Sequence, residues 1–317
     1  MLVGREHELN ALNAHYNEML SGKGSILFLT GEAGLGKTTL VHEWQKTITS
    51  PALFAEADCS IPIGNVDVGA MEALQPWADV IARLQTVANN FDLTKIIEDS
   101  SPAWKWALMD DDVTKHKEPS GNPNASNQQQ LFQQYVNLLS GISAETPLVI
   151  FLDDVHWADA SSISLLFYIS RQITDKRILV VATYRPEEIT TVNDAAGHPL
   201  INAKKEILRY NNGKELSLNY FTNEVINEFL VKTFPSYATD QNFEQWLQNI
   251  SSGNALFVSQ FIKTLYEDGQ LDEYGKFTGS YETITIPDST LAVVMQRLRR
   301  LEDATRELLG YATAEGE

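Results

Sequence analysis

A glycine-rich segment that ends in lysine and threonine is the part of the sequence whose spacing most clearly indicates chemistry. Gly31–Thr38 reads GEAGLGKT and fits G-x-x-x-x-G-K-[ST] at every position. Glycines let the backbone wrap around phosphate oxygens with its N–H groups pointing inward. We expect Lys37 to reach the β- and γ-phosphates of a nucleotide as a catalytic group, and Thr38 to bind Mg²⁺. The predicted nucleotide contacts in this segment and directly after it are Gly34, Leu35, Gly36, Lys37, Thr38 and Thr39.

A pair of adjacent carboxylates is the second feature with chemical potential. The apolar run Leu148–Leu152 predicts a buried strand, and it ends in Asp153 and Asp154. Two carboxylates at the end of a buried strand are unusual unless a cation lies nearby. We expect Asp153 to hold Mg²⁺ through water and Asp154 to orient or deprotonate an attacking water molecule. Such a pair alone is more often a turn cap; downstream of a phosphate loop it indicates hydrolysis.

Two further segments near these carboxylates carry polar candidates. The run Ile178–Thr183 predicts another strand, and it leads into Tyr-Arg-Pro. By resemblance to ATPases in which this strand ends at the γ-phosphate, Thr183 and Arg185 are candidate sensors of that phosphate, with Arg185 the candidate for catalysis. The alternative for Arg185 is a surface arginine before a proline turn. Asp159 is expected to cap the helix that starts near Ala160.

The elements that must position these residues alternate between strands and helices. Alternation of this kind predicts an α/β fold with a parallel sheet covered on both faces. The predicted strands are Ser25–Thr30, Ala52–Ala57, Leu148–Leu152, Ile178–Thr183 and Glu215–Leu218, and the clearest predicted helices are Glu6–Leu20, Ser161–Gln172 and the one that follows the phosphate loop from about Thr39. That last helix would direct the positive end of its dipole at the phosphates.

The pattern changes at two places along the chain. Asp110–Gln130 is polar and rich in Pro, Gly and Asn, which predicts a flexible insertion between the second and third strands. After Leu218 the strands stop, and Thr222–Phe234, Gln241–Ile250 and Leu256–Asp268 are predicted as helices of a small lid. The predicted domains are an ATPase domain (1–220), the lid (221–280), and the truncated start of a further helical domain (281–317).

Composition restricts the class of protein. The chain has 317 residues, of which 43% are hydrophobic, and a formal net charge of -18. That charge opposes a large nucleic-acid surface on this chain, although it does not oppose a phosphate loop, which uses backbone amides and one lysine. No apolar run approaches the roughly 20 residues that span a bilayer. The single cysteine, Cys59, cannot form an internal disulfide, which fits a reducing cytoplasm. From this cysteine and the lack of a long apolar run, we expect a cytoplasmic protein without membrane contact.

These motifs together resemble one family, the STAND class of signal-transduction ATPases. The likeness is strongest to the AAA-like ATPase domains of large bacterial transcriptional regulators and some adenylyl cyclases, and it covers nearly the whole chain. Besides GEAGLGKT, the matching segments read LVGRE (Leu2–Glu6), LVIFLDDVHWAD (Leu148–Asp159), ATYRP (Ala182–Pro186) and GNALFV (Gly253–Val258), where Ala255 stands in place of the usual proline. Pro287–Ala314 is similar to the first helices of the winged-helix domain that follows in the family.

The resemblance implies an architecture and a mechanism. The sheet would have five strands in the order 5-1-4-3-2, with the fourth strand ending at the γ-phosphate, and a helical lid would follow. Val3, Gly4 and Arg5 would pack on the adenine. ATP with Mg²⁺ would favour a signalling state, slow hydrolysis to ADP would reset it, and the partners would be other domains of the same polypeptide or further copies of it.

Two other functions fit parts of the same pattern. A nucleotide-binding interaction module without hydrolysis would need the loop but not both Asp153 and Asp154. A DNA-engaged ATPase of the initiator or clamp-loader kind would share the sheet and the lid, and the charge of -18 weighs against it.

Overall fold

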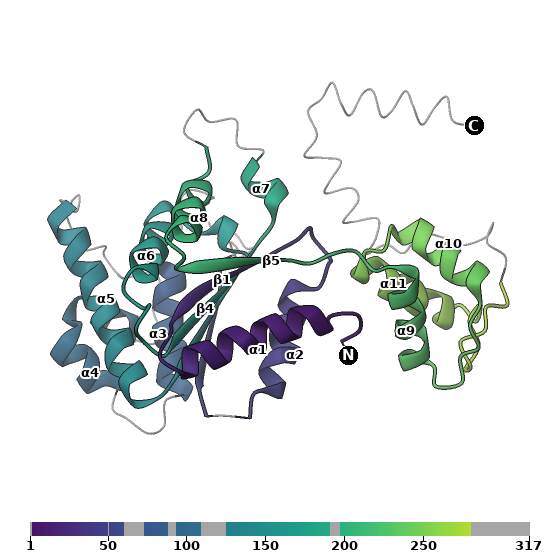
Figure 1. Ribbon diagram of the computed structural model, residues 1–317, viewed down its shortest axis with the longest axis horizontal. Helices are drawn as coiled ribbons and strands as arrows, with labels where there is room; N and C mark the ends of the chain where they lie inside the picture. Colours follow the sequence, from purple (N-terminus) through teal and green to yellow (C-terminus); the bar gives the residue numbers. More distant parts are fainter. Residues whose placement is uncertain are drawn as a thin grey trace. The chain divides into compact units, whose positions relative to one another are not determined.

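The computed structural model describes residues 2–49, 51–59, 73–87, 93–108, 125–190 and 197–279. These residues form two compact units (Figure 1). The larger unit comprises Arg5–Ala33 and Lys37–Leu218. The described part of the smaller unit comprises residues 2–4, 34–36 and 219–279. The segment Pro287–Ala314, predicted to begin a winged-helix domain, lies outside the described residues.

A five-stranded sheet organises the larger unit. All paired strands are parallel, and their order is β2-β3-β4-β1-β5. This order confirms the predicted one, including the place of the fourth strand between the strand before the phosphate loop and the strand that ends in the carboxylates. The strands are β1 (Ser25–Thr30), β2 (Leu53–Asp58), β3 (Leu148–Asp153), β4 (Ile178–Tyr184) and β5 (Gly213–Ser217).

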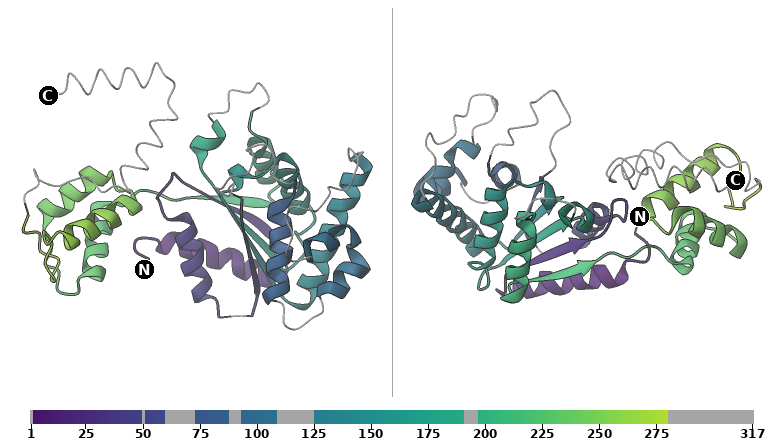
Figure 2. Two further views of the ribbon diagram at one scale, coloured as in Figure 1. Left: turned by 180° about the vertical axis from the view of Figure 1, so that it is seen from behind. Right: turned by 90° about the horizontal axis from the view of Figure 1, so that it is seen from above.

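Both faces of this sheet are covered, which explains its continuous apolar runs. Successive strand residues point to opposite faces. In β1, Ile26 and Phe28 join the main hydrophobic core, while Leu27 and Leu29 on the other face are equally buried. Figures 1 and 2 show α1 (Glu6–Leu20) and α2 (Lys37–Thr47), in purple, on one side of the sheet.

The helices between β2 and β5 supply the other layer. They are α3 (Gln75–Val87), α4 (Leu93–Ser100), the 3₁₀ turn η1 (Pro102–Leu108), α5 (Ala125–Glu145), the 3₁₀ turn η2 (Val155–Trp157), α6 (Ala160–Ser170), α7 (Pro186–Thr190) and α8 (Pro199–Arg209). Asp159 caps α6 as predicted, because its side chain accepts hydrogen bonds from the N–H groups of Ser161 (2.8 Å) and Ser162 (3.0 Å).

The boundary between the predicted insertion and the helix before β3 is wrong. Helix α5 begins at Ala125, so the end of the predicted insertion, up to Gln130, is helical. The part of the insertion before Ala125 lies outside the described residues. Glutamine has a good helix propensity, whereas the polarity of the segment and its content of Pro, Gly and Asn predict a loop up to Gln130.

Three helices build the described part of the smaller unit: α9 (Asn223–Thr233), α10 (Gln241–Ser251) and α11 (Ala255–Glu267). Their apolar faces meet in a second hydrophobic core that includes Phe243 and Phe261. Each helix has a side-chain cap, provided by Thr222, Asp240 and Asn254 respectively. The three lid helices predicted from the sequence are therefore present, with differences only at their ends.

Candidate active site

The phosphate-loop segment has the backbone that its glycines predict. Gly34 and Gly36 have φ values of 84° and 88°, in the left-handed region that side chains disfavour. Within the smaller unit, a Cβ atom added at Gly34 would lie 2.6 Å from the Asn254 Oδ1 atom, so the position also needs glycine for space. Leu256 N donates a hydrogen bond to Gly34 O (3.0 Å). Helix α2 begins directly after the loop, at Lys37, two residues before the predicted start.

Lys37 is a buried cation at the first position of that helix. Only 6% of its surface is exposed, and its Nζ donates to the carbonyl oxygens of Gly31 (2.6 Å) and Glu32 (3.1 Å). Burial lowers the pKa of Lys37, the positive charge of Arg185 lowers it further, and nearby carboxylates oppose both effects. Because a buried ammonium lacks water, an anion such as a phosphate would interact with it strongly.

Thr38 and Asp153, the two predicted metal ligands, are hydrogen-bonded to each other. The Thr38 hydroxyl donates to Asp153 Oδ2 at 2.7 Å. Burial raises the pKa of Asp153, while hydrogen bonds from the hydroxyls of Thr183 and Thr38 lower it. The Thr38 proton is directed to Asp153, which leaves lone pairs on its oxygen suited to a cation, and Asp153 supplies the carboxylate. This oxygen set fits Mg²⁺ held by a phosphate-loop hydroxyl and a strand-end aspartate.

Asp154 follows with a backbone conformation different from that of the strand. Its φ of 51° and ψ of 48° are left-handed, a conformation that aspartate and asparagine adopt more readily than most residues. An extended backbone would send adjacent side chains to opposite faces, and the left-handed residue ends that alternation. The N–H of Asp154 donates to Thr183 Oγ1 at 2.7 Å. Thr183 Oγ1 is thus a partner of the Asp153 carboxylate and of the Asp154 backbone N–H.

Arg185 contacts a carboxylate in a way that the sequence did not indicate. Its Nη2 atom lies 2.8 Å from Asp154 Oδ2, and its Nη1 atom lies 3.8 Å from Glu188 Oε1. The side chains of Arg185 and Asp154 are about one-fifth exposed, so this ion pair is partly shielded from water. Glu188 was absent from the predicted site because nothing in its spacing distinguishes it from a surface glutamate.

A second polar cluster anchors the strand end beside Arg185. The Tyr184 hydroxyl donates to Glu215 on β5 and accepts from Lys204 Nζ on α8 (2.6 Å). Lys204 Nζ also lies 2.8 Å from Glu215 Oε1. Burial and the hydrogen bond to Glu215 raise the pKa of Tyr184. This cluster fixes the backbone that carries Arg185.

The predicted adenine contacts divide between the two units. Arg5, in the larger unit, is buried and pairs with Glu8 (Nη1–Oε1 3.1 Å), and burial lowers its pKa. Gly4, in the smaller unit, has a φ of 58°, and a Cβ atom there would lie 2.5 Å from Val225 on α9. Val3 is buried and belongs to the smaller unit with Gly4. The lack of a side chain at Gly4 thus allows the backbone to pack closely against α9 of the lid.

The larger unit therefore gathers six of the predicted residues. Lys37, Thr38, Asp153, Asp154, Thr183 and Arg185 are linked there by hydrogen bonds, ion pairs or charge interactions. Thr39, also predicted as a nucleotide contact, is exposed on α2. Leu35 is buried and belongs, with Gly34 and Gly36, to the smaller unit.

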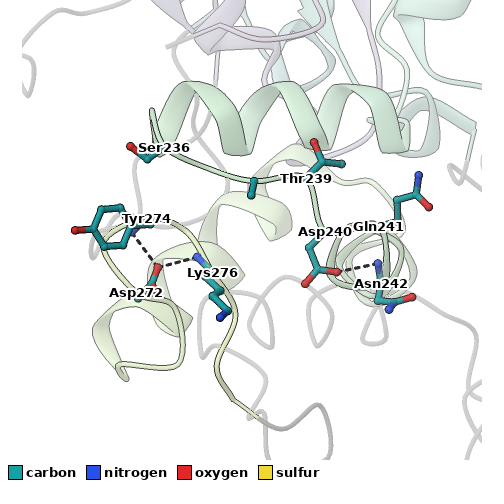
Figure 3. Close-up of a pocket in the computed structure, with 9 residues that line it drawn as sticks. Ser236, Thr239, Asp240, Gln241, Asn242, Asp272, Tyr274 and Lys276 are labelled. Carbon is teal, nitrogen blue, oxygen red and sulfur yellow. Dashed lines mark hydrogen bonds between the residues drawn. The ribbon is translucent and has the colours of Figure 1, made fainter.

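A separate cavity of about 670 Å³ lies in the smaller unit (Figure 3). Its carboxylates are occupied by local turns: Asp240 accepts from Asn242 N (3.0 Å), and Asp272 accepts from the N–H groups of Tyr274 (2.9 Å) and Lys276 (2.8 Å). These bonds, drawn dashed in Figure 3, account for the acidic groups of the cavity as caps and turns.

Comparison with known families agrees with this geometry. The sequence matches the AAA ATPase domain over residues 1–181, which is more than half of the chain. The chain belongs to this AAA ATPase family. The match includes the phosphate loop, the acidic strand and most of β4, and it confirms the predicted resemblance to AAA-like ATPase domains.

Two proteins that are similar to this AAA ATPase domain share only a small part of its sequence. An uncharacterized protein of Rhizobium meliloti, R02095, is 26% identical over 208 residues, which cover 62% of this chain and 19% of the relative. The chain thus spans about a fifth of the length of that relative. The Walker-type ATPase PABY2304 of Pyrococcus abyssi is similar in fold, with a TM-score of 0.50, 14% identity, and coverage of 94% of this chain and 76% of that chain.

A STAND protein with a tetratricopeptide repeat sensor, PH0952 of Pyrococcus horikoshii, has a TM-score of 0.45 at 15% identity. The alignment covers 97% of this chain and 34% of that one.

None of the described helices is both long and apolar enough to cross a membrane.

Proposed function

We propose that this AAA ATPase domain binds ATP with Mg²⁺, hydrolyses it slowly, and acts as the nucleotide-operated switch of a larger signalling or transcription-regulatory protein in the cytoplasm. The observation that carries the proposal is the cluster of Lys37, Thr38 and Asp153, which combines a buried cation with the oxygen ligands that Mg²⁺ prefers. The hydroxyl belongs to the phosphate loop, and the carboxylate is at the end of β3.

Each residue of the cluster has a separate task in this proposal. Lys37 binds the β- and γ-phosphates, and its fixed position on α2 keeps its charge in place without reorganisation. Thr38 and Asp153 would hold the metal. Bound Mg²⁺ supplies charge neutralisation on the phosphate oxygens. Asp154 orients the attacking water and accepts its proton.

The ion pair of Asp154 and Arg185 supports slow rather than rapid turnover. A guanidinium 2.8 Å from Asp154 Oδ2 occupies that oxygen, so while the pair is intact the other oxygen, Oδ1, has to receive the proton of the attacking water. A γ-phosphate is an alternative partner for the same guanidinium, because arginine binds phosphate and carboxylate oxygens in the same way. We propose that Arg185 exchanges Asp154 for the γ-phosphate during the cycle.

The proposed place in a larger protein rests on sequence observations. The chain covers only a fifth of its Rhizobium meliloti relative, so a domain of this kind occurs within a much longer polypeptide. The motifs from LVGRE to GNALFV resemble STAND ATPases, in which the output belongs to other domains or to further copies of the protein.

The proposed function is tested by measuring ATP binding and phosphate release with Mg²⁺ and with EDTA. We expect ATP to bind in both conditions, more tightly with Mg²⁺, and phosphate to be released only with Mg²⁺, because Thr38 and Asp153 act through the metal. Release that continues in EDTA would contradict the assigned metal site. Tight binding without any release in a single-turnover assay would identify a binding module instead.

We also expect ATP to be preferred over GTP. The sequence lacks an N-K-x-D element that would read guanine, and Val3–Arg5 is proposed to contact adenine through backbone groups and an apolar surface. Competition of unlabelled ATP and GTP against a labelled ATP analogue measures the preference. Equal competition by the two nucleotides would contradict the adenine assignment, while leaving the phosphate loop unaffected.

A further inference from the structure

Thr183 lies between β1, the strand before the phosphate loop, and β3, the strand that ends in the carboxylates, and its side chain is buried. It belongs to the central strand β4, which pairs with β1 on one side and β3 on the other. In this register Thr183 is opposite Leu29 of β1, and the preceding residue, Ala182, is opposite Leu152 of β3. The exposed fraction of Thr183 is 0%. Its hydroxyl therefore has to find its partners inside the protein.

The hydrogen bonds of this hydroxyl use its only proton. Thr183 Oγ1 donates to Asp153 Oδ1 and accepts from the N–H of Asp154 at 2.7 Å. Asp153 has its other oxygen, Oδ2, on the Thr38 hydroxyl at 2.7 Å. A threonine hydroxyl has one donor, so Thr183 cannot donate to a phosphate without releasing Asp153. The γ-phosphate contact predicted from the sequence would therefore require the bond to Asp153 to break.

The two bonds join groups that differ in backbone conformation. Asp153 is the last residue of β3, and Asp154 is the left-handed residue after it. The N–H of Asp154 donates to the side chain of Thr183 on the neighbouring strand β4, and this bond holds the left-handed turn in place. One hydroxyl thus sets the rotamer of the first carboxylate and the backbone of the second.

We propose that Thr183 is a positioning residue that holds Asp153 and Asp154 in a single fixed arrangement and does not contact the nucleotide. This inference rests on the proposed function, because it concerns how the two carboxylates serve metal binding and hydrolysis. The feature required at position 183 is the hydroxyl, since both bonds are made by Oγ1.

Three variants separate the hydroxyl from the size of the side chain. Thr183→Val keeps the shape and removes the hydroxyl, Thr183→Ser keeps the hydroxyl, and Thr47→Val is the matched control, because it removes a hydroxyl that donates to Trp44 O at the far end of α2. ATP affinity in EDTA, the gain in affinity on adding Mg²⁺, and the single-turnover rate are measured for each. Thermal unfolding verifies that each variant is folded.

We expect Thr183→Val to bind ATP in EDTA like the wild type, to lose most of the Mg²⁺-dependent gain, and to hydrolyse about 10²-fold more slowly, the loss typical of a misplaced catalytic group. Thr183→Ser and Thr47→Val should remain close to the wild type. If the valine variant does not fold, Thr183→Cys provides the same contrast with serine, because a thiol is a weak hydrogen-bonding group.

Three results would overturn the inference: a valine variant with the wild-type Mg²⁺ gain and rate, a serine variant as impaired as valine, or a folded valine variant that loses ATP affinity in EDTA. A failure of the proposed function gives a different result. If the wild type gains affinity with Mg²⁺ but releases no phosphate, hydrolysis is wrong, and the Mg²⁺ gain of the valine variant still decides the role of Thr183. If the wild type does not bind ATP, both proposals fall.

Discussion

Replacing Lys37 by alanine is expected to abolish tight ATP binding. Lys37 is a buried cation held at the start of α2 by the carbonyl oxygens of Gly31 and Glu32, and in the proposed complex it is the side-chain cation on the β- and γ-phosphates. Removing one member of a buried, hydrogen-bonded charge pair costs about 2–5 kcal/mol, or about 30-fold to several thousand-fold in affinity. Isothermal titration calorimetry with ATP measures this loss directly.

Two further variants make the result specific. Lys46→Ala removes a lysine from the last turn of the same helix, where its Nζ pairs with Glu43 (2.6 Å) in an exposed position, and should leave the affinity unchanged. Lys37→Met keeps the length of the apolar stem and removes only the charge, so it should bind as poorly as alanine. Wild-type affinity in either Lys37 variant would refute the assignment of the phosphate loop.

The sheet and its motifs could be predicted because their signals are local. Each strand is a short apolar run, and the buried parallel sheet requires such runs whatever else surrounds them. The phosphate loop likewise depends on residue types at fixed spacing, with Gly34 and Gly36 in conformations that require glycine. The order of the five strands was predicted from the family resemblance rather than from these runs, since an apolar strand does not specify its neighbours.

The pairing of side chains within the site could not be predicted, because it depends on residues far apart in the sequence. Thr183 meets Asp153 only because β4 lies beside β3 in a particular register. The same register brings Arg185 to Asp154, a pairing different from both roles that the sequence left open for this arginine, a γ-phosphate sensor or a surface residue. A composition-based argument also failed at the start of α5, where polar residues form a helix.

Replacing Asp154 by asparagine is expected to spare ATP binding and to slow hydrolysis by about 10² to 10⁴, the usual contribution of general-base assistance. Asparagine suits the site because it also tolerates the left-handed backbone, with φ near 51°, and the N–H that donates to Thr183 is unchanged. The substitution therefore removes the negative charge and the proton acceptor without straining the turn. Alanine would confound the result, because it disfavours that conformation.

The ion pair with Arg185 requires its own control. Asp154→Asn also frees the guanidinium, so an altered rate could come from Arg185 and not from the missing base. Glu188→Gln removes the other carboxylate near Arg185, 3.8 Å away, and leaves Asp154 in place. If the base is the decisive group, Glu188→Gln should hydrolyse ATP at a rate close to that of the wild type.

Single-turnover rates, measured together with the nucleotide content after purification, distinguish the remaining outcomes for Asp154. A domain that retains ADP would otherwise show a low rate for reasons unrelated to the substitution. Asp153→Asn is the matched comparison, and it should lose the Mg²⁺-dependent gain in affinity that Asp154→Asn keeps. An Asp154→Asn variant as fast as the wild type would leave this carboxylate with a structural role only. If that variant instead loses binding while Asp153→Asn retains it, the roles of the two carboxylates are exchanged.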